Sequence, residues 1–171
     1  MEIRKIREED VVRVGEIFGS CADVMNENGL YNWTRAYPTA REAAADYAKG
    51  TIYGIYEEEK LLGVITLDQS PAPEYAGVEW QVSLEESLCV HRVAIDPPYH
   101  SAGAASRLLQ FAEDLAREQG LKAMRIDSFS KNQRAVQLYQ YLGYELRGDI
   151  FYNKKDERVR GIPFHCLEKV L

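Results

Sequence analysis

Small residues cluster where a strand-like segment ends and a helix-like segment begins. Residues 93–95 end an apolar run, residues 96–98 (Asp-Pro-Pro) stop it, and residues 101–106 read Ser-Ala-Gly-Ala-Ala-Ser. The first amides of a helix have no partner inside the helix and lie at the positive end of its dipole. Small side chains would let a pyrophosphate reach those amides. A tightly packed helix start needs the same small residues, so this stretch alone favours neither interpretation.

A second segment with residues that could take part in a reaction runs from Asp127 to Tyr144. It contains a carboxylate, Asp127, and a phenol, Tyr139. Taken alone, Tyr139 is more typical of a core tyrosine and Asn132 of a helix cap.

Hydrophobic spacing predicts the elements that must position these residues. Along the chain, the expected order is one strand, two helices, three strands, one helix, one strand, one helix and two strands. The strands cover residues 2–7, 51–56, 61–67, 88–95, 124–129, 144–152 and 162–170, and the helices begin near residues 11, 39, 101 and 132. Thr39 and Glu42 form a capping-box pattern, and Gly50 is a helix stop.

The segment from residue 88 to residue 129 reads as strand, helix, strand, which implies two parallel neighbouring strands. The rest of the pattern is hairpin-like. The sequence therefore predicts an α+β fold with one mixed sheet.

Composition excludes several classes of protein. The 171 residues carry 21 Lys and Arg against 27 Asp and Glu, a net charge of −6. That balance argues against general nucleic-acid binding, which needs a basic face. No apolar run approaches a membrane span, and residues 1–10 hold no signal-peptide core. We therefore expect one domain over residues 1–171, in the cytoplasm, with no membrane partner.

The three cysteines are Cys21, Cys89 and Cys166, which are far apart and include no CxxC pair. This spacing is typical of buried thiols rather than of a metal site or a disulfide. We expect no metal ion.

Together the two chemical segments resemble the GNAT superfamily of CoA-dependent N-acetyltransferases. The family's cofactor motif, Arg/Gln-x-x-Gly-x-Gly/Ala, is read here as His100-Ser101-Ala102-Gly103-Ala104-Ala105; its downstream motif is read as Asn132, Ala135, Leu138-Tyr139 and Gly143-Tyr144. The resemblance covers nearly the whole chain. It implies a central mixed, mostly antiparallel sheet with helices on both faces and one parallel βαβ unit at the cofactor site. His100 departs from the family's usual Arg or Gln, and Ala105 stands in place of the commoner glycine.

The resemblance also implies roles for individual residues. Acetyl-CoA would be the co-substrate, and its pantetheine arm and thioester would bind main-chain groups of Val93, Ala94 and Ile95. Its pyrophosphate would bind backbone amides of Ser101, Ala102, Gly103, Ala104, Ala105 and Ser106. Asn132 matches the asparagine that contacts the pantetheine arm. Tyr139 matches the general acid, and Asp127 lies where some N-terminal acetyltransferases of the superfamily carry a catalytic glutamate, although a structural role for it stays open.

The implied function is transfer of an acetyl group from acetyl-CoA to a primary amine, by direct attack in a ternary complex. The acceptor is a small molecule or a peptide α-amine. Tyr31, Trp33 and Trp80 could line its pocket, or their rings could simply cover the sheet. The alternative function is a GNAT-fold module that senses acyl-CoA without turnover. A homodimer stays open.

Overall fold

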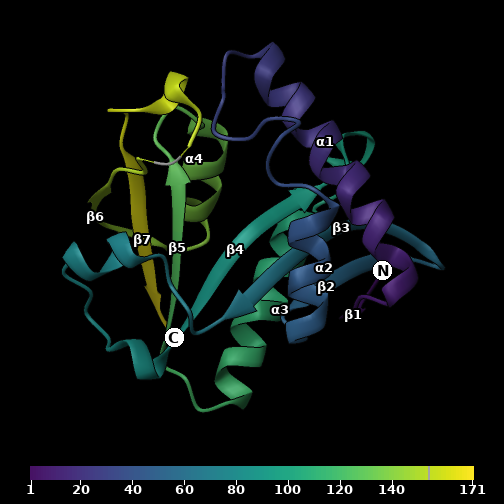
Figure 1. Ribbon diagram of the computed structural model, residues 1–171. Helices are drawn as coiled ribbons and strands as arrows, with labels where there is room; N and C mark the ends of the chain where they lie inside the picture. The colour runs from purple at the N-terminus through teal and green to yellow at the C-terminus, as the bar shows by residue number, and fades with distance from the viewer. Residues whose placement is uncertain (154) are drawn as a thin grey trace. The chain divides into compact units, whose positions relative to one another are not determined.

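The computed structural model describes residues 1–153 and 155–171, and within them it contains four α-helices and seven β-strands (Figure 1). The strands are β1 (Glu2–Lys5), β2 (Ile52–Glu57), β3 (Lys60–Asp68), β4 (Ser87–Ile95), β5 (Ala123–Phe129), β6 (Glu145–Ile150) and β7 (Phe164–Val170). The helices are α1 (Val11–Glu27), α2 (Ala40–Lys49), α3 (Ala104–Glu118) and α4 (Gln133–Tyr141). This element order confirms the predicted one.

The strands form a mixed sheet in the order β1-β2-β3-β4-β5-β7-β6. The β4–β5 pair is parallel, as the βαβ pattern predicts, while the pairs β1–β2, β2–β3, β5–β7 and β6–β7 are antiparallel. The predicted α+β fold is therefore confirmed. The chain divides into two compact units that share β4 and α3: residues 1–67 with 92–111, and residues 68–91 with 112–171.

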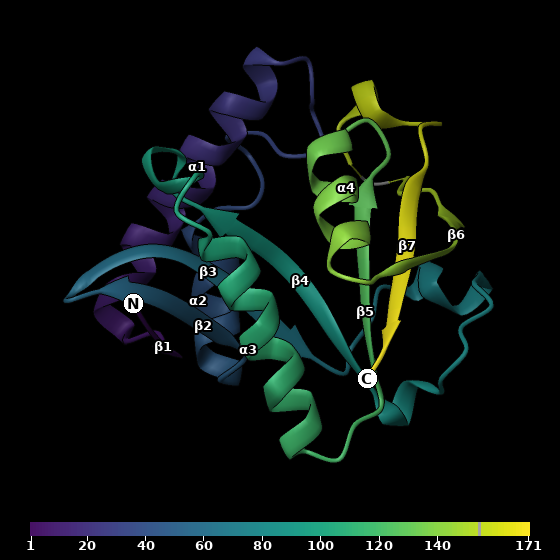
Figure 2. The ribbon, with the colours of Figure 1, turned by 180° about the vertical axis from the view of Figure 1, so that it is seen from behind.

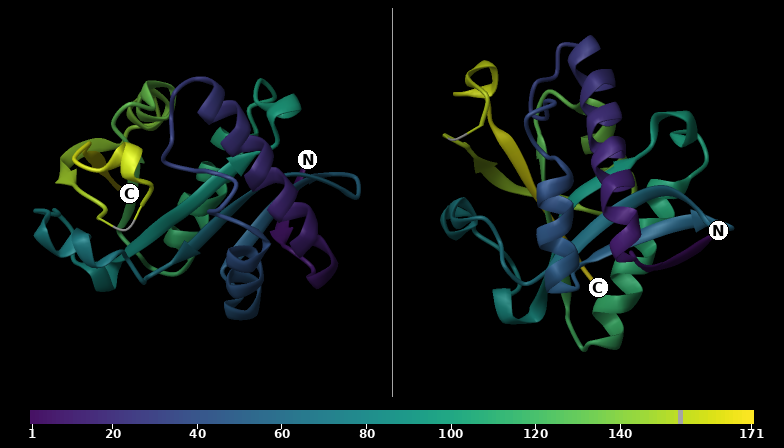
Figure 3. Two further views of the ribbon diagram at one scale, coloured as in Figure 1. Left: turned by 45° about the horizontal axis from the view of Figure 1, so that its top comes forward. Right: turned by 45° about the vertical axis from the view of Figure 1, so that its right-hand side comes forward.

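The first unit is a three-stranded antiparallel sheet with helices on both faces. Helices α1 and α2 lie side by side over one face of β1–β3, and the start of α3 lies over the other (Figures 1, 2 and 3). Its buried core includes Val14, Ile17, Phe18, Ala43, Ile52, Tyr56, Leu61, Val64 and Ala94. Burial of these apolar side chains supplies the main stabilisation of the unit.

Local signals in the sequence fix both ends of α2. The Thr39 and Glu42 side chains form the capping box, with the Thr39 amide donating to a Glu42 carboxylate oxygen at 2.7 Å. Gly50 ends the helix with a φ of 70°, in the left-handed conformation that glycine adopts without steric cost. Both predicted boundaries of α2 are confirmed.

Helix α3 begins three residues later than predicted, at Ala104 rather than near Ser101. Residues 97–99 form a short 3-10 helix, and Gly103 has a φ of 74°, which an α-helix cannot contain. The first α-helical bond in this region joins the Arg107 amide to the Gly103 carbonyl at 3.1 Å. Residues 101–103 therefore form a turn that leads into the helix.

The second unit is built on the antiparallel strands β5, β7 and β6. The start of β4 joins β5 through the parallel pairs Ser87–Ala123, Leu88–Met124 and Cys89–Arg125, while β5 pairs with β7 over its full length. Helix α4 lies over one face of β5 (Figure 2). Residues 69–86 form a loop that contains two short 3-10 helices, Pro73–Gly77 and Leu84–Glu86.

Close approach of β3 to β4 in the first unit requires a glycine at position 63. A β-carbon there would lie 2.5 Å from the Ile95 Cδ1 atom and 2.7 Å from the Ala94 carbonyl oxygen. Because that oxygen belongs to the main chain, the contact cannot be relieved by a change of rotamer. The absence of a side chain at Gly63 thus sets the spacing of the two strands.

We expect Gly63→Ala to lower the free energy of unfolding by about 1–3 kcal/mol, the usual cost of overpacking. Urea denaturation of the purified variant measures this loss. The control is Gly77→Ala, because no atom lies within 4 Å of a β-carbon built there. Equal midpoints for the two variants would contradict the steric role of Gly63.

Candidate functional site

The end of β4 in the first unit presents a main chain held firmly by neighbouring side chains. Ala94 and Ile95 are buried, and Val93 is half-buried. The Ile95 carbonyl accepts a hydrogen bond from His100 Nε2 at 2.7 Å and another from the Cys21 thiol at 3.1 Å. His100 therefore ties the turn after β4 back to the strand. This bond explains how the chain uses a residue that departs from the family motif.

The amides at the start of α3 have the donor chemistry that a pyrophosphate requires. The amides of Gly103, Ala104, Ala105 and Ser106 precede the first helical hydrogen bond, so the helix itself leaves them without a partner. Residues 101–103 are exposed, and no atom lies within 4 Å of a β-carbon built at Gly103. A phosphate group can approach the main chain here without meeting a side chain. The residues present fit the diphosphate of acetyl-CoA.

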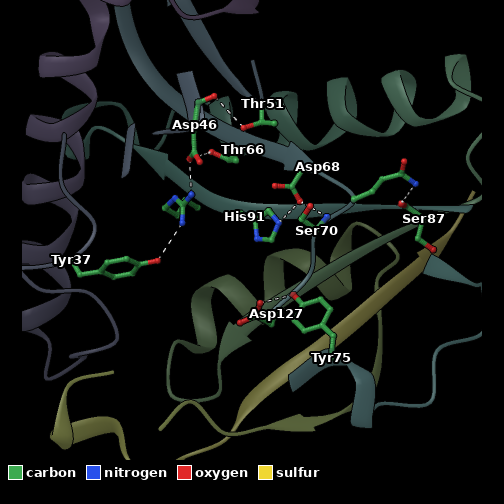
Figure 4. Close-up of polar contacts among 12 residues, drawn as sticks. Tyr37, Asp46, Thr51, Thr66, Asp68, Ser70, Tyr75, Ser87, His91 and Asp127 are labelled. Carbon is green, nitrogen blue, oxygen red and sulfur yellow. Dashed lines mark hydrogen bonds and ion pairs between the residues drawn. The ribbon is translucent and has the colours of Figure 1, made fainter. Parts of the chain in front are cut away.

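Arg92, just before the predicted pantetheine segment, is a feature that sequence reasoning missed. Its φ is 35°, in the left-handed region that side chains other than glycine rarely adopt. Its guanidinium pairs with the Asp46 carboxylate at 2.6 Å and donates to the Tyr37 hydroxyl at 3.2 Å. Asp46 also accepts a hydrogen bond from the Thr66 hydroxyl at 2.9 Å (Figure 4). These contacts hold β4 in a bend immediately before residues 93–95.

The aromatic residues of the α1–α2 loop have mixed positions within the first unit. The Trp33 ring packs edge-on against Phe18, with ring centroids 5.6 Å apart, at the margin of the core. Tyr31 is half-buried, and Tyr37 is exposed. The position of Trp33 fits its role as a cover for the sheet. Roles for Tyr31 and Trp33 in acceptor binding stay predictions.

In the second unit, Asp127 is the centre of a cluster of hydrogen bonds. The Tyr75 hydroxyl donates to Asp127 Oδ1 at 2.5 Å (Figure 4), and the Tyr152 side chain also hydrogen-bonds to the carboxylate. Burial raises the pKa of the Asp127 carboxyl, against the opposing effects of these bonds and of the positive charge of Lys155. The residue nevertheless keeps part of its surface exposed. Asp127 is therefore a half-buried residue whose carboxyl has a raised pKa.

Tyr139 on α4 lies in surroundings that disfavour the loss of its phenolic proton. The side chain is buried, and burial together with the nearby Asp127 charge raises the pKa of its phenol above the ordinary value of 10. The hydroxyl thus stays protonated at neutral pH. The structure brings together in one unit the two residues that the sequence put forward for acid and base roles.

Asn132 and Trp80 have structural contacts of their own. The Asn132 side-chain oxygen accepts from the Ala135 amide at 3.3 Å and caps α4, which confirms the helix-cap interpretation and leaves its contact with the cofactor a prediction. The Trp80 indole donates to the Tyr75 carbonyl at 2.9 Å, and its ring packs 5.2 Å from the Tyr75 ring. Trp80 thereby supports the tyrosine that contacts Asp127.

Sequence reasoning missed Tyr75 and Tyr152 altogether. Tyr75 lies in a 3-10 helix of the loop 69–86, and Tyr152 lies beyond the end of β6. Single tyrosines in segments without hydrophobic periodicity give no signal of a shared partner. Only the folded chain shows that both hydroxyls meet the same carboxylate.

The structure also bears on thiols, metal ions and membranes. All three cysteines are free and buried, as predicted. Among the described residues, no group of three or more His, Cys, Asp or Glu side chains is arranged to hold a metal ion. Over the same part of the chain, no helix combines the length and apolar character needed to span a bilayer.

Comparison with known proteins gives a consistent result. A family described as the acetyltransferase (GNAT) family matches residues 18–144. The uncharacterized N-acetyltransferase YesJ of Bacillus subtilis is 24% identical over 148 residues, which are 82% of this chain and 79% of YesJ.

Two solved structures, each less than 25% identical, share the fold. The structure of yncA from Salmonella typhimurium with its cofactor acetyl-CoA has a TM-score of 0.71 and 17% identity, covering 99% of this chain and 93% of that one. The paia N-acetyltransferase of Thermoplasma acidophilum in complex with coenzyme A has a TM-score of 0.70 and 19% identity, covering 99% and 98%.

The raised pKa of Asp127 predicts a pH dependence of stability. The folded state holds the Asp127 proton more tightly than the unfolded state, so its contribution is fully present below the unfolded pKa of about 3.9 and is lost as the pH rises through the folded pKa. An asparagine does not titrate. We therefore expect the stability of Asp127→Asn, relative to the wild type, to improve as the pH rises from about 4 towards 7. Urea denaturation at several pH values measures this, and a constant difference would contradict the raised pKa.

Proposed function

Because the chain belongs to the acetyltransferase (GNAT) family, we propose that it transfers the acetyl group of acetyl-CoA to a primary amine of a small molecule or a peptide. The observation that carries this proposal is that the buried phenol of Tyr139 and the Asp127 carboxyl belong to one compact unit. Support comes from yncA and the paia N-acetyltransferase, whose structures hold acetyl-CoA and coenzyme A. A plain structural domain has no need for such a pair of proton-handling groups.

Acetyl-CoA brings an acyl group that is already activated as a thioester. In the proposal the main chain of Val93, Ala94 and Ile95 binds its pantetheine arm, and one of these amides polarises the thioester carbonyl. The backbone amides of Ser101 and of residues 103–106 bind its pyrophosphate, and Asn132 contacts the arm. The Ala102 amide, which the sequence also put forward, already donates to the Tyr99 carbonyl at 3.1 Å. The bonds from His100 and Cys21 to the Ile95 carbonyl support this assignment, because they hold the strand end rigid.

Proton transfer is the harder part of the reaction. An alkyl ammonium with a pKa of about 10.4 costs about 4.6 kcal/mol to deprotonate at pH 7, whereas a peptide α-amine with a pKa of about 7.8 costs about 1 kcal/mol. A base therefore matters most for a lysine-like acceptor. The raised pKa of Asp127 reduces its mismatch with such an amine, which improves its fitness as the base.

Tyr139 is the proposed acid at the other end of the transfer. Its hydroxyl holds a proton at neutral pH and donates it to the departing thiolate. The amine attacks the thioester directly, with acetyl-CoA and acceptor bound together. We further propose that residues 1–171 act as one catalytic domain, in a reducing compartment that suits its three free thiols.

The proposed function is tested by a transfer screen with acetyl-CoA over amino acids, polyamines, aminoglycosides and peptides with free N-termini, read by release of free thiol. We expect release that depends on both the enzyme and one acceptor class. The control omits the acceptor. If no acceptor produces thiol while acetyl-CoA at 100 times its Kd stabilises the fold by about 2.7 kcal/mol, the protein is a sensor of acyl-CoA and not an enzyme.

Tyr139→Phe removes the proposed acid while keeping the ring. We expect kcat to fall by about 100-fold or more, the usual contribution of a positioned general acid, with the KM for acetyl-CoA nearly unchanged. The matched control is Tyr141→Phe on the same helix, whose side chain is 87% exposed. Steady-state kinetics of both variants decide the matter, and an unchanged kcat for Tyr139→Phe would remove this residue from the mechanism.

A further inference from the structure

One face of the β5–β7 pair carries a carboxylate next to a group of aromatic rings. The strand register places Asp127 opposite Cys166 and Phe129 opposite Phe164. Because side chains alternate along a strand and partners share a face, Asp127, Phe129 and Phe164 lie on the same face. The centroids of the Phe129 and Phe164 rings are 5.1 Å apart, and the Tyr152 ring meets Phe164 edge-on at 4.8 Å.

The hydrogen bonds on the Asp127 carboxylate leave its negative charge in place. The two groups that donate to it, Tyr75 and Tyr152, are neutral phenols whose pKa values burial and the Asp127 charge raise further. Phenols can orient a carboxylate, but they bring no positive charge to balance it. A partly desolvated carboxylate of this kind favours a cation as its neighbour.

The chain itself already places a primary ammonium group in this setting. The Lys155 ammonium lies 5.3 Å from the centroid of the Tyr152 ring and 5.4 Å from that of Phe164. Both distances fall within the range of about 6 Å for cation–π attraction. The Lys155 charge also acts on the Asp127 carboxyl. A lysine side chain is a tethered alkyl ammonium, so its position shows which ligand chemistry this face accepts.

We propose that Asp127 and the rings of Tyr152 and Phe164 form the site for the ammonium group of the acceptor, and that Lys155 occupies this site until the acceptor displaces it. The inference rests on the proposed acetyl transfer and narrows its substrate class to alkyl amines that are cationic at neutral pH. Arylamines and alcohols, which are neutral at that pH, gain nothing from this site. An acceptor carboxylate is disfavoured here by the like charge of Asp127.

The proposed site also accounts for the protons of the reaction. The bound ammonium gives one proton to the Asp127 carboxylate, and the freed amine forms the new C–N bond as the C–S bond breaks. Tyr139 gives its proton to the leaving sulfur. The product nitrogen releases its second proton, which restores the Tyr139 phenol. One proton remains on Asp127 and passes to solvent, which balances the conversion of an ammonium and a thioester into an amide and a thiol.

A tethered competitor lowers the apparent affinity of a site for free ligands. A group on a short flexible tether has an effective concentration of roughly millimolar order. A free amine must therefore bind well enough, or be concentrated enough, to displace the tethered group. Removing the Lys155 ammonium should therefore tighten the binding of any cation that fits between Asp127 and the rings. This expectation separates a bound placeholder from a lysine that merely stabilises the loop.

The test is a calorimetric titration with choline in the absence of acetyl-CoA. Choline carries an ammonium centre that cannot be acetylated, and 3,3-dimethylbutan-1-ol is its neutral carbon analogue. We expect Lys155→Ala to bind choline about tenfold more tightly than the wild type does. The alcohol should bind neither the wild type nor Lys155→Ala. The double variant Lys155→Ala with Asp127→Asn should lose the increase in choline affinity. The matched control is Lys122→Ala, which removes an exposed lysine paired with Glu86 at 2.8 Å and should bind choline as the wild type does.

Two results would overturn the inference: choline binding to Lys155→Ala no tighter than to the wild type, or equal binding of choline and the alcohol. Circular dichroism of each variant verifies that the fold is intact, and the binding gain in Lys155→Ala cannot come from unfolding. Because the titration contains no acetyl-CoA, a negative choline result contradicts the ammonium site alone. A negative transfer screen contradicts the proposed acetyl transfer. Where turnover is observed, Lys155→Ala should lower the KM for a cationic acceptor.

Discussion

A carboxylate placed among protein atoms is the constraint on which the second unit depends. An ionised group removed from water costs several kcal/mol unless hydrogen bonds and opposite charge compensate for it. Tyr75 and Tyr152 hydrogen-bond to Asp127, Trp80 supports Tyr75, and Lys155 adds a positive charge nearby. The 3-10 helix that carries Tyr75 and the Tyr152 side chain beyond β6 thus meet at one group. The same group keeps the Tyr139 proton in place.

The first unit is organised around main-chain groups. Side chains fix the course of β4 through the Arg92–Asp46 pair and through the bonds from His100 and Cys21 to the Ile95 carbonyl. The amides at the start of α3 are then available for recognition. Main-chain recognition makes few demands on the identity of neighbouring side chains. His100 has a structural task at its position, because it donates to the Ile95 carbonyl.

Periodicity and capping signals predicted the fold well, because they act within a few residues of one another. The ends of α2 follow from Thr39, Glu42 and Gly50 alone. The start of α3 was wrong by three residues, since small residues suit both a turn and a helix and only the backbone angle of Gly103 separates them. The cluster around Asp127 was only half predicted: the strand and helix supplied Asp127 and Tyr139, but Tyr75 and Tyr152 come from loops. Contacts between loops depend on the folded chain, and a single sequence carries no local signal for them.

The 3-10 segment that carries Tyr75 and the segment that carries Tyr152 are surface connections, while Asp127 belongs to a strand paired along its whole length. Connections of this kind accept substitutions and changes of length more readily than strands do. Under the proposed function, the binding of the acetyl-CoA pyrophosphate and the selection of the amine therefore depend on different parts of the chain. Exchanging these two connections would change the environment of the proposed base, while the strand that bears it and the turn proposed to hold the phosphates would stay as they are.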